Sequence, residues 1–240
     1  MNIKLAAALA AAVAMTAAAP AVVATAQPKP PADALADPSL KSDEVIKFIG
    51  LKPGDKVADI VSGRFARALG AAVGPKGKLY AVMPSEVAKL HPEVMPAMQA
   101  AAAGSNGVIE LSTPPVNAMA LPAKSLDAVF IRQNYHDLYD KFMGPADVPG
   151  FNKQVYAALK PGGVYVILDH DAPGAPMIVT ETLHRIDKAQ VIKDVTAAGF
   201  KLDSESKILA NPEDDHSKMV FVPAIRGKTD QFLLKFRKPK

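Results

Sequence analysis

Histidines and carboxylates lie close together at four places in the second half of the sequence. Four of the five histidines lie beyond the ends of predicted strands, each with an acid within three residues: His136, His170, His184 and His216. Imidazole titrates near neutral pH, so such residues serve as general bases, and with carboxylates they also bind divalent metal ions. The alternative is that they are polar loop residues that hydrogen-bond the backbone. No two histidines have the spacing of an H-x-x-x-H motif, so the sequence assigns no metal ligands and leaves a metal site open.

Predicted strands and predicted helices alternate along the sequence, and these elements must position the histidines and carboxylates. Five apolar runs have the length of strands, and most are separated by segments with helical periodicity. The predicted strands cover residues 56–61, 78–83, 107–111, 125–131 and 164–168, and the predicted helices 43–49, 64–73, 86–103, 150–159 and 188–198. This alternation predicts an α/β domain with a mostly parallel sheet. Residues 200–209 and 229–236 have no helix between them, which predicts an antiparallel edge.

The first residues have the pattern of a secretory signal. Lys4 precedes an apolar, alanine-rich run, and Ala24-Thr25-Ala26 offers the small residues that a signal peptidase reads. We therefore expect a signal peptide over 1–26, a Pro- and Ala-rich flexible linker over 27–38, and one domain over 39–240, in an exported protein that is periplasmic or secreted. The apolar run is shorter than the roughly 20 residues of a membrane span, so none is predicted. The alternative is an N-terminal helix that packs on the domain.

Composition excludes several function classes. The sequence has no cysteine, which rules out disulfides, thiolate zinc sites, a thiol nucleophile and a lipid-anchored cysteine. The net charge of +4 is spread along the chain, and no basic stripe with interleaved aromatic residues predicts nucleic-acid binding. A small molecule is the expected partner, and the oligomeric state stays open.

Three stretches resemble class I S-adenosylmethionine-dependent methyltransferases. Residues 51–59 (LKPGDKVAD) resemble the entry to that family's first strand, 72–82 (AVGPKGKLYAV) its second strand, and 158–166 (ALKPGGVYV) the turn into its fifth. More narrowly, the chain resembles a group of exported, predicted methyltransferases. That likeness rests on residues 133–137 (QNYHD), 169–170 (DH), 183–187 (LHRID), 214–216 (DDH) and 225–232 (IRGKTDQF).

The resemblance implies a Rossmann-like fold that uses S-adenosylmethionine as cofactor to methylate an unknown small molecule. In that fold the ligands lie at the carboxyl ends of the parallel strands. The cofactor would then contact Asp59, Gly63 and Asn134, while Tyr135, His136 and His170 would be the catalytic candidates. Because the fourth and fifth strands are neighbours, we expect His136, His170 and either His184 or His216 to line one cleft.

The sequence departs from the family's pattern where the cofactor binds. Gly63 is the single glycine where the family has several, Arg64 replaces a small residue, and Met83-Pro84 supplies no carboxylate for the ribose. Each missing contact costs about 1–3 kcal/mol, so we expect a cofactor dissociation constant at or above ~100 μM. Two other functions stay open: an exported, non-methylating ligand-binding protein on a degenerate methyltransferase fold, and a metal- or histidine-dependent enzyme of another class.

Overall fold

The computed structural model describes residues 33–144 and 146–240. The predicted signal peptide and the first part of the predicted linker lie outside this range. Residues 33–38 of the linker contact the domain: Ala34 is buried and its N–H donates to the Arg64 carbonyl at 2.8 Å, while Asp37 pairs with the Arg64 guanidinium at 2.5 Å. Compact structure therefore begins before Ser39.

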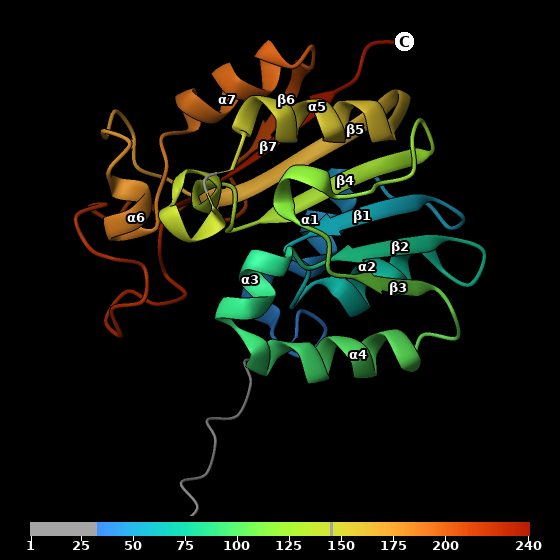
Figure 1. Cartoon of the computed structure of the whole chain (residues 1–240). Helices are drawn as coiled ribbons and strands as arrows, with labels where there is room; N and C mark the ends of the chain where they lie inside the picture. Colours follow the sequence, from blue (N-terminus) through green and yellow to red (C-terminus); the bar gives the residue numbers. More distant parts are fainter. Residues whose placement is uncertain (1–32, 145) are drawn as a thin grey trace, which may run out of the picture. The chain divides into compact units, whose positions relative to one another are not determined.

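One mixed sheet organises the domain (Figure 1). Its strands are β1 (Lys56–Ile60), β2 (Lys78–Val82), β3 (Ile109–Ser112), β4 (Leu126–Arg132), β5 (Leu159–His170), β6 (Lys201–Ser206) and β7 (Gln231–Arg237). The strand order is β3-β2-β1-β4-β5-β7-β6, and β1 to β5 pair in parallel. β7 runs antiparallel to both β5 and β6. The predicted α/β fold with a mostly parallel sheet and an antiparallel edge is confirmed, and the strand order reverses between β1 and β4.

Helices cover both faces of the sheet. The α-helices are α1 (Ser42–Ile49), α2 (Ala66–Val73), α3 (Ser85–Leu90), α4 (Met95–Ala103), α5 (Val148–Ala158), α6 (Val179–Leu183) and α7 (Lys188–Ala197). Short 3₁₀ turns are η1 (Pro38–Leu40), η2 (Pro92–Val94), η3 (Val116–Ala118), η4 (His136–Tyr139) and η5 (Lys141–Met143). Among the described residues, no helix is long and apolar enough to cross a membrane.

The alternation of side chains along each strand produces two cores. Val57 and Leu69 belong to the core under α1, α2 and α4, whereas Ala58 and Val155 belong to the core under α5 and α7. Strands buried on both faces are apolar at successive positions, which is why the sequence shows continuous runs rather than alternation. Because helices cover both faces of the sheet, polar groups gather at the ends of the strands.

Several local details differ from the sequence-based expectation. Pro92 does break the helix predicted over 86–103, and η2 separates α3 from α4. The turn predicted at 160–163 is instead part of β5, at a register irregularity opposite β4. α1 begins at Ser42, one residue before the helix predicted over 43–49, and Lys41 takes the cap position in a left-handed conformation (φ 48°).

Candidate functional site

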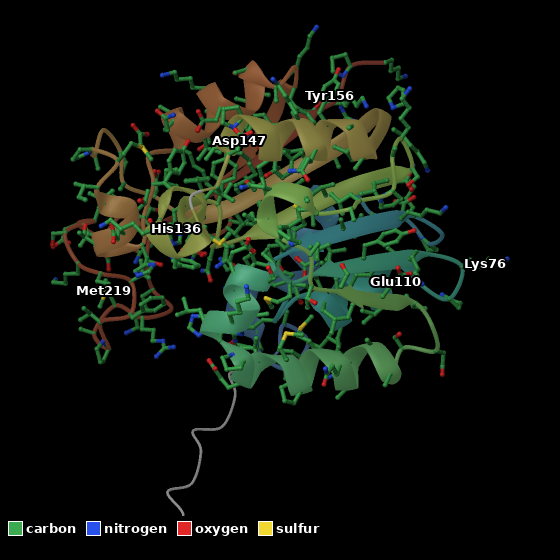
Figure 2. The ribbon with its side chains drawn as sticks, in the orientation of Figure 1. Lys76, Glu110, His136, Asp147, Tyr156 and Met219 are labelled. Carbon is green, nitrogen blue, oxygen red and sulfur yellow. The ribbon has the colours of Figure 1, made fainter. Side chains whose placement is uncertain are left out.

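The carboxylate of Asp169 joins the ends of β4 and β5. Its Oδ2 accepts the backbone N–H of His136 at 2.9 Å, and its Oδ1 accepts that of His170 at 2.8 Å. The same Oδ1 lies 2.8 Å from Nδ1 of the His136 ring. Asp169 is completely buried, so its carboxylate is paired with these groups of His136 and His170 rather than with water. His136 is thereby fixed at the carboxyl end of the sheet, opposite the turn that holds Lys76 (Figure 2).

Asp137 and His184 complete a compact cluster around the other ring nitrogen of His136. His136 Nε2 lies 3.1 Å from Asp137 Oδ1 and 3.4 Å from His184 Nδ1, and the last two atoms are 3.8 Å apart. Asn134 Nδ2 donates to the other oxygen of Asp137 at 2.6 Å. His184 arrives from α6, which packs against η4. We call His136, Asp137 and His184 the histidine cluster.

Charge in the histidine cluster is strongly perturbed by burial. Burial alone would lower the pKa of His136, but the adjacent carboxylates of Asp169 and Asp137 outweigh it and raise this pKa well above its ordinary value. Burial opposes ionisation of Asp137 too, yet His136, His184 and Asn134 lower its pKa below the usual range. The two carboxylates beside His136 therefore favour its charged form.

The four predicted histidines separate into two groups. The His170 ring centroid lies 6.4 Å from that of His136, and the His184 centroid 5.4 Å from it. His170 Nδ1 is 2.7 Å from the Thr229 hydroxyl, and burial followed by the nearby charge of His136 lowers the pKa of His170 well below its ordinary value. The His216 ring instead pairs with Asp230 at 3.1 Å. The expected convergence thus involves His136, His170 and His184.

A buried ion pair anchors the connection between β6 and β7 beside this region. Arg185, fully buried, lies 2.9 Å from Asp214, which also accepts the N–H of Asp230 at 2.7 Å. Arg185 Nη1 donates to the Asp171 carbonyl at 3.1 Å. Arg185, the residue after His184, therefore links the end of β5 to the connection between β6 and β7. These contacts of Arg185 hold α6 against the sheet.

Asp59 and Gly63 lie at the end of β1, next to β4. Ser62 Oγ donates to Asp59 Oδ2 at 2.6 Å. Burial raises the Asp59 pKa to about 6, against the opposing effects of the Ser62 hydroxyl, the Gly63 N–H and the charge of Arg132. Val61 between them has a φ of 53°, which is strained for a β-branched residue. A Cβ built on Gly63 meets no atom within 4 Å, so the backbone here is open to a ligand.

Two predicted site residues have structural partners. Tyr135, proposed as catalytic, is instead fully buried in the core beneath α5, and its hydroxyl accepts a hydrogen bond from Asn152 Nδ2 at 2.8 Å. Both residues are buried, but neighbouring side chains here point in different directions: Tyr135 contacts Asn152 of α5, whereas His136 contacts Asp169 and Asp137. Asn134, proposed to bind the cofactor, is engaged with Asp137. Sequence reasoning named His184 only alongside His216 as a residue of the expected cleft, and it assigned no site role to Asp137 or Asp169, although each lies in a histidine–acid pair.

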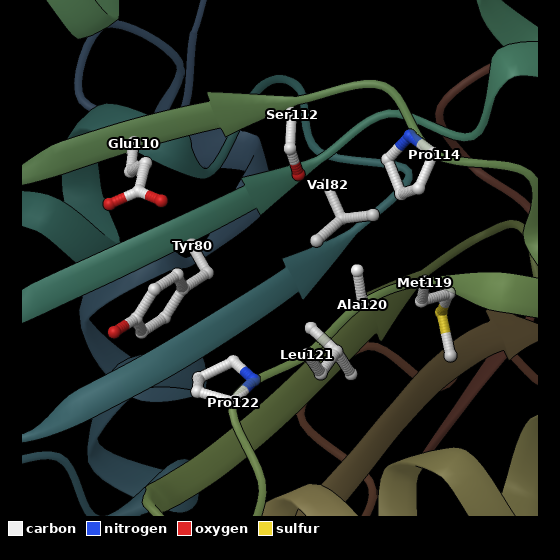
Figure 3. A pocket seen from close by; sticks show the side chains of 9 residues that line it. All are labelled: Tyr80, Val82, Glu110, Ser112, Pro114, Met119, Ala120, Leu121 and Pro122. Carbon is white, nitrogen blue, oxygen red and sulfur yellow. The ribbon is translucent and has the colours of Figure 1, made fainter.

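A pocket of about 400 Å³ lies on the sheet face between β2, β3 and the segment before β4 (Figure 3). Tyr80, Val82, Glu110 and Ser112 form its floor, and Met119 and Leu121 are among the residues opposite. Val82 and Ser112 are the last residues of their strands, so the pocket reaches the carboxyl ends. In the strand order it is separated from the histidine cluster by β1.

Comparison with known proteins gives structural matches only. No family model matches the chain, and no curated protein matches its sequence. An S-adenosylmethionine-dependent methyltransferase from Aquifex aeolicus has a TM-score of 0.56 at 21% identity, covering 85% of this chain and 94% of its own. The [4+2]-cyclase SpnF has a TM-score of 0.55 at 16% identity, covering 84% and 80%.

A third structure is phosphoethanolamine N-methyltransferase 2 from Haemonchus contortus, in complex with S-adenosyl-L-methionine. It has a TM-score of 0.59 at 14% identity, and the match covers 84% of this chain and 53% of that one. At such identities the likeness concerns the fold alone. The sheet order, its single reversed strand and these structural matches show that the chain has the Rossmann-like fold of S-adenosylmethionine-dependent methyltransferases.

Proposed function

We propose that this protein is an S-adenosylmethionine-dependent methyltransferase that acts on a small molecule. The observation that carries the proposal is the turn after β1. Asp59 and Gly63 lie at the reversal of strand order, where open α/β sheets bind their ligands, and His136 lies in η4, which follows the neighbouring strand β4. The structural neighbours add support, because two of those described above are named as methyltransferases and one holds the cofactor.

The residues at the carboxyl end of β1 suit a reaction that mainly requires the acceptor and the methyl group to be aligned. The cofactor's sulfonium is already activated, so an enzyme must hold the acceptor in line with the methyl group. Gly63 gives the cofactor close access to the backbone, and the Asp59 carboxylate is the acidic group of that turn. Arg64, which occupies the position of a small residue in the family, has its guanidinium held by Asp37. The pocket of Figure 3 offers a largely apolar surface between β2 and β3, and β2 is the neighbour of β1 in the sheet.

Calorimetric titration with S-adenosylmethionine and its demethylated product tests the proposal. We expect saturable binding with a dissociation constant of about 100 μM or weaker, since the ribose carboxylate and several glycines are missing. Gly63→Val is the matched variant: the Cβ that it adds meets no atom within 4 Å, so we expect unchanged stability, while a ligand against the turn would be displaced. The exposed His91→Ala serves as control.

The outcomes separate the candidate functions. Binding that Gly63→Val weakens at least tenfold, followed by formation of S-adenosylhomocysteine with a small-molecule acceptor pool, supports the methyltransferase. No saturable binding at millimolar cofactor would overturn it. Binding without any demethylated product would favour a ligand-binding protein.

We also propose that the protein is exported. Lys4, the apolar run after it and Ala24-Thr25-Ala26 support this location. An intact mass of the exported protein that still includes residues 1–26 would contradict it.

A further inference from the structure

We propose that His136, Asp137 and His184 bind one divalent transition-metal ion, with Zn²⁺ as the probe of choice. This inference goes beyond the proposed function, because methyl transfer from a sulfonium requires no metal. It rests on the geometry of the histidine cluster, on the hydrogen bonds behind its ligands, and on two features of the surrounding residues.

The three nearest donor atoms have the separations of a metal coordination shell. His136 Nε2, Asp137 Oδ1 and His184 Nδ1 are 3.1, 3.4 and 3.8 Å apart. The circle through three such points has a radius of about 2.0 Å, so one ion could lie within Zn–N and Zn–O bonding distance of all three atoms. Two imidazoles and one carboxylate would surround the ion close to one plane and leave the positions outside that plane open.

The groups behind two of the ligands are those that metal sites use to orient them. Asp169 Oδ1 lies 2.8 Å from Nδ1 of His136, which places the proton on that nitrogen and leaves Nε2 directed into the cluster when a metal is bound. Asn134 Nδ2 donates to Asp137 Oδ2 and leaves Oδ1 for the ion. These partners therefore favour the tautomer and the carboxylate orientation that coordination requires.

The charge around the cluster favours a cation. Asp137 and Asp169 both face His136, and Asp140 interacts electrostatically with Asp137, His136 and His184. Asp140 is 3% exposed, and its Oδ1 has no hydrogen-bond partner among the described residues. A buried carboxylate oxygen without a partner costs free energy unless positive charge lies nearby. A metal ion bound by the histidine cluster would supply positive charge near this oxygen.

His184 is held in a conformation that its residue type does not favour. It caps α6 with a φ of 52°, a left-handed position at which glycine is the usual residue. Such strain persists mainly where a side chain is needed. The His184 side chain is also 25% exposed, so the cluster has access to solvent and an ion could enter.

The open positions suggest what the ion would do. Three protein ligands with free positions are typical of sites that bind water or a substrate oxygen rather than of closed structural sites. The ion would therefore coordinate an oxygen of the small-molecule substrate, or a water molecule, at the carboxyl ends of β4 and β5.

Titration of the untagged, EDTA-treated full chain with ZnCl₂ tests the site without any cofactor present. We expect one equivalent of Zn²⁺ to bind with a dissociation constant of about 10 μM or tighter, and Co²⁺ to give a visible ligand-field spectrum. His184→Gly removes one ligand and relieves the left-handed strain, so it should keep the melting temperature of the metal-free wild type and weaken Zn²⁺ binding at least tenfold. His91→Gly, the same change at an exposed histidine outside the cluster, should bind as the wild type does.

Two results would overturn the proposal: no stoichiometric binding at about 100 μM Zn²⁺, or equal binding by the wild type and His184→Gly. If His184→Gly proves unstable, Asp137→Asn decides, because it preserves the side-chain volume and must also weaken binding. Since cofactor titration in EDTA tests the methyltransferase separately, failure of one proposal leaves the other intact.

Discussion

Replacing Asp59 by Asn should stabilise the protein at neutral pH while it weakens cofactor binding. Asp59 is 2% exposed and its pKa rises from 3.8 to about 6, chiefly because burial disfavours the charged form. Its hydrogen bond from Ser62 and the charge of Arg132 offset only part of that cost. A carboxylate retained at such a cost, in the turn that faces a ligand, is expected to serve binding rather than folding.

The magnitude follows from the shift of about two pKa units. Each unit corresponds to 1.36 kcal/mol, so the ionised carboxylate destabilises the fold by roughly 3 kcal/mol above pH 6. Because the folded-state pKa is raised, this residue's contribution to stability is fully present below about pH 4 and is lost as pH rises through about 6. The Asn amide needs a new acceptor, which reduces the expected gain to about 1–2 kcal/mol at pH 8.

Urea unfolding of the wild type and Asp59→Asn between about pH 4 and pH 8 measures the effect. The stability difference should be smallest at the acid end, grow through pH 5–6 and level off above that. Ser62→Ala is the opposing variant, since loss of its hydroxyl donor should destabilise the ionised form further. A variant that is less stable than the wild type at pH 8, or a gain that shrinks as pH rises, would refute the assignment of a burial penalty to Asp59.

Two further changes test the positions of buried polar groups. Tyr135→Phe removes the acceptor of Asn152 Nδ2 and should cost about 1–3 kcal/mol in urea unfolding without altering cofactor affinity; a lost affinity with unchanged stability would restore Tyr135 to the site. Arg185→Met leaves the Asp214 carboxylate buried without its ion pair and should cost about 3–5 kcal/mol, together with faster proteolysis of the connection between β6 and β7; a loss below 1 kcal/mol would show that this pair does not hold the connection.

The order and type of the main elements could be predicted because their cause is local. Runs such as residues 128–131 (AVFI) are apolar at every position because both sheet faces are covered, and glycine stops α2 at Gly74. The insertion of β7 between β5 and β6 could not be read from the chain, because it depends on pairing between segments far apart in sequence. The short helix α6 has too few residues to show a period.

The sequence could predict which of the candidate residues lie together, but only in part. Neighbouring parallel strands bring His136 and His170 to one edge, which the strand assignment alone implies. The approach of His184 depends instead on the connection after β5, which Arg185 and Asp214 fix through tertiary contacts. Tyr135 was misplaced because a single step along an irregular turn reverses the direction of a side chain, and no periodicity exists there to indicate it.

Costly features of this fold gather at the ends of β1, β4 and β5. Val61 (φ 53°) and Gln133 (φ 55°) follow β1 and β4, although neither is a residue that favours this conformation. Arg132 is the last residue of β4, which lies between β1 and β5. Its charge interacts with both Asp59 of β1 and Asp169 of β5. Burial lowers the pKa of Arg132 to about 10, so this side chain stays positive at neutral pH. Each of these features lowers the stability of the folded protein. Their concentration at one edge is what a binding site on this scaffold would require, since ligand contacts can repay a cost that the core cannot.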